Sequence, residues 1–166
     1  MNHYVKIKLF IPLLLSISTL CLAISPLSAS GNVAMIEHKE ILTQYIEDIR
    51  KLQDHIITLL EDVTGVPPVS NTDFTSELSL IYNEMEDVEK RILNYISSVP
   101  KLSYQRRDLL LSLVALNSVE NSLYQLSQFI KETSGVEKAL LLEDFYFLRT
   151  SASDTLYRLE RIIERE

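Results

Sequence analysis

Cysteine, glycine and tryptophan are scarce in this chain, and each scarcity excludes a class of chemistry. The single cysteine, Cys21, lies in an apolar run near the N-terminus, so no internal disulfide can form and residues 31–166 have no thiol. Three glycines leave no glycine-rich loop to hold a phosphate. The sequence has no Gly-x-Ser-x-Gly or Cys-x-x-Cys-His motif, which argues against a serine hydrolase and against covalently attached haem. Few glycines and only five prolines favour long helices.

Basic residues are the next shortage. The formal charge is −7, and the first 30 residues hold two of the sixteen lysines and arginines but no acid, which leaves −9 for residues 31–166. Binding of nucleic acid requires a dense basic face, and adsorption to anionic lipid requires a basic cluster. We therefore predict no nucleic-acid partner and no membrane contact except through the N-terminal segment.

Residues 1–30 have the composition of a secretory signal peptide. Lys6 and Lys8 precede an apolar run at 9–24, which is short for a membrane span, and small residues follow at 28–31. This predicts cleavage after Ser30 and an exported domain at 31–166, in the periplasm, on the cell surface or secreted, in a bacterium. No cleavage site is ideal, so an uncleaved N-terminal anchor is the alternative. Leu20 before Cys21 disfavours lipid attachment.

The rest of the sequence predicts an all-α fold, an antiparallel up-down-up-down four-helix bundle preceded by the signal peptide. Apolar residues recur at alternating steps of three and four in four stretches, and short connections favour antiparallel neighbours. The stretches cover 33–64, about 71–100, 103–133 and 134 to the end. Ser103 is expected to cap the third, and Ser134 the fourth in a capping box with Glu137. A helical hairpin that dimerises into a coiled coil is the alternative. Core positions in the fourth stretch are Leu141, Phe145, Leu148, Ala152, Leu159 and Ile162.

Metal and cofactor sites are not predicted. His38 and His55 are 17 residues apart, roughly 25 Å along one helix, so they cannot share an ion. Paired Glu-x-x-His motifs, which build di-iron bundles, are absent from the sequence. The acidic residues at 84–89 fall mostly off the apolar stripe and are expected to face solvent. We predict no catalytic residue, no metal ligand and no cofactor.

The stretch 109–130 is unusual because Glu120 is its only formal charge. An exposed helix face normally carries charges. Enclosure of this helix within the bundle is the favoured explanation, and the alternative is a face that docks another protein, since charges are depleted at interface centres. Glu120 is expected to form a partly buried ion pair with Arg91 or Arg149. The residues of the predicted interface are Asn117, Asn121, Gln125 and Gln128.

A basic cluster marks the predicted turn between the second and third helices. Lys101, Arg106 and Arg107 could contact an anionic headgroup or an acidic partner, since guanidinium groups bind phosphate and carboxylate. The competing interpretation is structural, because cations are favoured at the C-terminus of a helix.

The leading hypothesis for function is an exported, non-catalytic protein that acts through protein–protein contact, with another protein or with a second copy. The first alternative is a carrier that holds a small apolar molecule in the bundle core, beside the aromatic residues 145–147. An exported all-helical enzyme that binds a small anion through inward arginines is less favoured, because Arg50, Arg91 and Arg149 flank the apolar stripes without replacing them.

Overall fold

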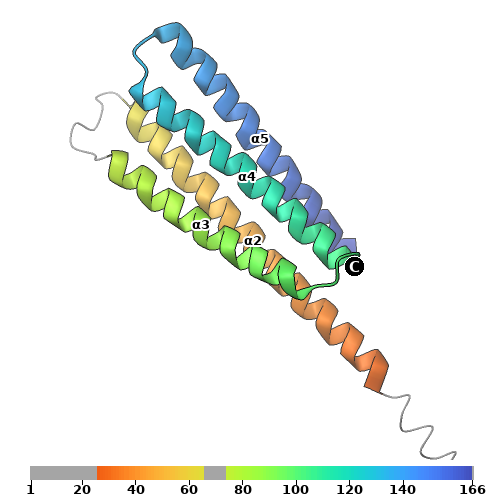
Figure 1. Ribbon diagram of the computed structural model, residues 1–166. Coiled ribbons are helices and arrows are strands. Elements are labelled where there is room, and N and C mark those ends of the chain that lie inside the picture. The colour runs from red at the N-terminus through yellow and green to blue at the C-terminus, as the bar shows by residue number, and fades with distance from the viewer. Residues whose placement is uncertain (1–25, 66–73, 166) are drawn as a thin grey trace, which may run out of the picture. The chain divides into compact units, whose positions relative to one another are not determined.

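The computed structural model describes residues 26–65 and 74–165, with side chains from residue 35, and every regular element in these ranges is an α-helix. The helices are α2 (Pro26–Thr64), α3 (Phe74–Ser98), α4 (Tyr104–Lys131) and α5 (Gly135–Arg165) (Figure 1). No strand occurs in the described ranges. The prediction of an all-α protein with four helices is confirmed.

Two compact units divide the chain, residues 1–39 and residues 40–166. In the first unit the described residues, 26–39, form the N-terminal part of α2, which begins earlier than the predicted residue 33. The second unit holds the rest of α2 together with α3, α4 and α5. Residues 1–25 of the predicted signal peptide lie outside the described residues. Among the described helices, none combines the length and apolar character needed to cross a membrane.

Consecutive helices of the second unit run in opposite directions (Figure 1). Arg91 of α3 pairs with Asp48 of α2, and Glu77 of α3 pairs with His55 of α2, so residue numbers rise along α2 as they fall along α3. The connections from α3 to α4 and from α4 to α5 are only a few residues long, which forces an antiparallel arrangement there as well. The chain order therefore places every helix beside its sequence neighbour.

The predicted apolar stripes form the core of this unit. Phe145, Ala152 and Leu159 are buried as expected, while Leu141 and Leu148 are only half-buried. Each fully buried leucine or isoleucine contributes roughly 1.5–3 kcal/mol relative to an exposed one. Four further apolar residues are buried at positions between the predicted steps: Ile96, Ala115, Phe129 and Leu156.

Helices α4 and α5 approach each other more closely along their length than the other described helix pairs do. Both helices bury small side chains, Ser112, Ala115 and Ser122 on α4 and Ala152 on α5, and small buried side chains are compatible with close packing of two helices. The Ser112 hydroxyl donates to the Asp108 carbonyl oxygen at 3.2 Å, four residues earlier. A buried hydroxyl satisfied inside its own helix needs no partner across the interface, so the two backbones can pack tightly.

The helix caps agree largely with the sequence predictions. Ser103 Oγ accepts the Arg106 amide at 3.1 Å, which confirms the predicted N-cap of α4. At α5, Ser134 Oγ accepts the Glu137 amide at 3.4 Å, as a capping box requires. The Ser134 amide, however, donates to Glu132 Oε1 at 2.8 Å. The second half of the predicted box is therefore made by Glu132, which precedes the helix and reaches the same amide.

Candidate protein-contact surface on helix α4

One exposed face of α4 carries no formal charge over four turns. Leu110, Val114, Asn117, Asn121 and Tyr124 recur at steps of four and three, so they share one face of the helix. All five are exposed, and the three apolar or aromatic side chains keep about half of their surface in water: 47% for Leu110 and 53% for Val114 and Tyr124. We call these five residues the uncharged face of α4.

Two of the four predicted interface residues lie at the centre of this face. Asn121 Nδ2 donates to the Asn117 carbonyl oxygen at 2.8 Å and to Asn117 Oδ1 at 3.0 Å, so the two amides are held together on the helix surface. Gln125 and Gln128 are half-buried, and Gln128 Nε2 lies 3.4 Å from Ser127 Oγ. The two asparagines therefore lie on the uncharged face, and the two glutamines lie at its margin.

The apolar members of the face were not predicted from the sequence. Leu110, Val114 and Tyr124 stand at the same helical spacing as Asn117 and Asn121, and that spacing was the signal available in the sequence. Burial of the opposite side of α4, the explanation favoured from sequence, accounts for that side alone. It does not account for the absence of charge on the uncharged face, which is exposed to water.

The predicted partly buried ion pair of Glu120 is wrong. Glu120 is exposed, and Arg91 instead pairs with Asp48 at 2.8 Å and with Asp87 at 3.1 Å. Glu120 lies beside the uncharged face, on the edge that borders α3. Its charge reaches across to Tyr82 of α3: burial raises the pKa of Tyr82, and the neighbouring carboxylate raises it further.

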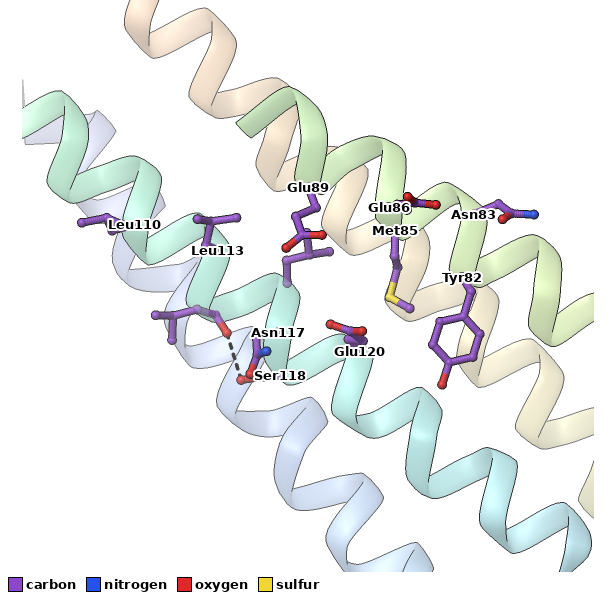
Figure 2. Close-up of a pocket in the computed structure, with 12 residues that line it drawn as sticks. Tyr82, Asn83, Met85, Glu86, Glu89, Leu110, Leu113, Asn117, Ser118 and Glu120 are labelled. Atoms are coloured by element: carbon purple, nitrogen blue, oxygen red, sulfur yellow. Dashed lines mark hydrogen bonds between the residues drawn. The ribbon is translucent and has the colours of Figure 1, made fainter. Parts of the chain in front are cut away.

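A groove of about 620 Å³ runs between α3 and α4 along this edge (Figure 2). Met85 and Leu116 are buried at its base, and Leu110 and Val114 of the uncharged face line its α4 side. Figure 2 shows the Met85 and Glu89 side chains extending from α3 toward α4. The groove and the uncharged face thus form one continuous surface.

The predicted anion cluster sits at the turn between α3 and α4, and both of its arginines have partners inside the protein. Arg106 Nη1 donates to the Ile96 carbonyl oxygen at 3.0 Å, near the end of α3. Arg107 Nη2 lies 2.7 Å from Asp108 Oδ1, and Asp108 is buried. Lys101 is exposed. The cluster stabilises the turn through these contacts, and contact with an external anion stays a prediction.

Arg50 and Arg91, also singled out from the sequence, pair with different acids and do not converge on one site. Arg50 Nη1 of α2 lies 2.6 Å from Glu160 Oε1 of α5, whereas Arg91 binds the acids of α2 and α3 described above. The aromatic run also divides: Phe145 is buried, while Tyr146 and Phe147 are 50% and 72% exposed. Neither the groove between α3 and α4 nor the one between α2 and α3 is lined by this run.

A charged cluster that sequence reasoning missed joins α2 to α3. His55 Nε2 lies 2.8 Å from Glu77 Oε1, and His55 Nδ1 lies 3.4 Å from Glu84 Oε2. The two carboxylates approach opposite edges of the imidazole ring, so one metal ion could not bind all three side chains. Within the described residues, no group of three or more histidine, cysteine, aspartate or glutamate side chains is arranged to hold a metal ion.

No family model, no curated protein and no solved structure matches this chain. The functional conclusion therefore depends on the charge, burial and geometry of the described residues. The uncharged face of α4 combines exposed apolar side chains with an absence of charge, unlike the charged, solvated surface expected of a bundle helix, and a groove lies beside it.

Proposed function

We propose that this protein is a non-catalytic, exported helical-bundle protein that acts by binding another protein through the uncharged face of α4. The observation that carries the proposal is the exposure of Leu110, Val114 and Tyr124 around two asparagines, with no charge among them. Protein interfaces are depleted in charged residues at their centres and enriched in tyrosine and other large side chains.

A partner that covers this face must remove water from its side chains. Covering a lysine or glutamate strips water from a charge, which is costly unless the partner supplies an opposite charge. Covering Asn117, Asn121 and the three larger side chains removes apolar surface from water at roughly 25 cal/mol per Å² and leaves amides that hydrogen-bond each other. This face therefore binds a partner at lower desolvation cost than a charged helix face does.

Export is the second part of the proposal and is supported by residues 1–30 alone. The charged start, the apolar run and the small residues at 28–31 fit a leader that directs the bundle to the cell envelope or outside the cell. In these compartments the lack of cysteine outside the leader leaves stability to packing, which the buried apolar core supplies.

Site-specific photo-cross-linking in cells that naturally express the protein tests the binding surface. The full-length protein carries p-benzoylphenylalanine at Asn117, or at Thr58 as a matched control, because Thr58 is an exposed uncharged residue of α2. We expect a discrete protein adduct from position 117 and none from position 58. Asn121→Arg should abolish the adduct without changing the midpoint of urea unfolding, since Asn121 is exposed.

Three outcomes would overturn the proposed surface: no adduct at 117, equal adducts at both positions, or an adduct that Asn121→Arg leaves intact. The mass of the adduct separates the occupants, because a second copy would give twice the mass of the chain and another protein would give a different sum. An adduct of twice the chain mass would replace heterologous binding with self-association.

A further inference from the structure

The groove between α3 and α4 has the dimensions of a short helix. On α4 its lining extends from residue 110 to residue 120, roughly 15 Å along the helix axis, or about three helical turns. Its base is apolar, with Met85 and Leu116 buried and Leu113 half-buried. Amphipathic helices bind such grooves through side chains spaced at i, i+3, i+4 and i+7.

All of the formal charges that line the groove are negative. Its lining includes Glu86, Glu89 and Glu120 and no lysine or arginine. Lys90 pairs with Glu86 at 2.8 Å, whereas Glu89 and Glu120 form no ion pair with any described residue. Figure 2 shows Glu89 on α3 and Glu120 on α4, so unpaired carboxylates stand on both walls. A ligand that fits the apolar base meets negative charge on either side.

This charge pattern selects among the occupants of the groove. A second copy seated by two-fold symmetry would present the same acidic walls to themselves, and each copy carries a net charge of −7. An acidic or uncharged helix would leave the carboxylates without a partner as the groove closes. A basic amphipathic helix complements both the apolar base and the walls.

We propose that the groove between α3 and α4 binds an amphipathic helix of a partner protein, an inference that rests on the proposed function. The apolar side of that helix packs on Met85, Leu113 and Leu116, and its lysines or arginines pair with Glu89 and Glu120. The uncharged face of α4 continues the contact beyond the groove.

Fluorescence anisotropy with a synthetic helix tests the chemistry directly. The probe is a labelled peptide of about 14 residues with leucines at i, i+3, i+4 and i+7 and lysines flanking them, and its counterpart has every lysine replaced by glutamate. We expect the full-length protein to bind the lysine peptide and not the glutamate peptide. Binding of the lysine peptide should weaken as the salt concentration rises from about 50 to about 500 mM.

Charge-matched variants separate the groove from the general acidity of the protein. Glu89→Gln combined with Glu120→Gln should weaken binding of the lysine peptide about fivefold or more, the effect of losing two exposed ion pairs. Glu61→Gln combined with Glu143→Gln changes the net charge equally, at exposed positions of α2 and α5, and should leave binding unchanged. Equal weakening in both double variants would overturn the inference, as would equal binding of the two peptides or no binding of the lysine peptide.

The photo-cross-linking experiment keeps this inference distinct from the proposed function. A protein adduct at Asn117 that persists in the variant Glu89→Gln with Glu120→Gln would retain protein binding and overturn the basic helix as its occupant. Loss of the adduct in that variant, with the midpoint of urea unfolding unchanged, supports the inference. Absence of any adduct from position 117 in the protein that keeps both glutamates would overturn the proposed function itself.

Discussion

His55 of α2 lies with its Nε2 atom 2.8 Å from the Glu77 carboxylate of α3, and its other ring nitrogen faces Glu84 at 3.4 Å. A neutral imidazole can donate only one hydrogen bond from its ring, so both contacts are satisfied together only when the ring is protonated. Burial of His55 lowers its pKa, but the hydrogen bonds to the two carboxylates and their negative charge outweigh burial and raise the pKa above 6.5.

The first prediction is that stability decreases as pH rises through the pKa of folded His55. A raised pKa means that folded His55 binds its proton more tightly than unfolded His55, so this stabilisation is complete below pH 6.5 and is lost above the folded pKa. The free energy of unfolding, measured in urea at pH 5.5 and 8.5, should fall by about 0.5–1 kcal/mol more for the natural protein than for His55→Gln.

The carboxylates provide the control for this prediction. The variant Glu77→Gln with Glu84→Gln keeps the histidine but removes both carboxylate charges, so its pH dependence should resemble that of His55→Gln. Lys51, Asp48, Asp87 and Arg91 line the same groove and are present in all three proteins, so the comparison isolates His55 and its two glutamates. Identical pH profiles for the natural protein and His55→Gln would contradict the link between the histidine and the two glutamates.

The helices and core were predictable because they depend on local periodicity. Steps of three and four along the chain place apolar side chains on one face wherever the helix lies, and Ser103 caps α4 through an amide only three residues away. The His55 cluster could not be predicted in this way. It depends on the axial register between α2 and α3, which brings together residues 22 and 29 positions apart through packing.

Only part of the candidate surface could be predicted, because its other part also depends on how the helices pack. The absence of charge around Asn117 and Asn121 is visible in the sequence, but which apolar neighbours face water is decided by how closely α4 meets each neighbouring helix. The tight contact with α5 and the wider spacing from α3 leave Leu110 and Val114 exposed beside the groove. A stripe pattern alone does not distinguish a half-exposed leucine from a core one.

The second prediction separates the core of α4 from its contact surface. Leu123 is fully buried, whereas Leu110 on the same helix is 47% exposed. Leu123→Ala should lower the free energy of unfolding by about 2–5 kcal/mol, because it removes apolar contacts and leaves a cavity. Leu110→Ala should change it by less than about 0.5 kcal/mol. Equal losses in urea unfolding would show that Leu110 is part of the core rather than of a surface available to a partner.

The last prediction concerns the close approach of α4 and α5. Ala152 is fully buried in α5, the helix that packs closely against α4, and a leucine there would need space that a close-packed interior does not leave. Ala152→Leu should therefore destabilise the protein by about 1–3 kcal/mol. Ala139→Leu is the matched control, since Ala139 lies in the same helix but is exposed, and it should be nearly neutral. Equal stability of the two variants would mean that α5 can move away from α4 at little cost. In that case the small residues Ser112, Ala115 and Ser122 would not set the spacing of the helices, and the exposure of the uncharged face would need another cause.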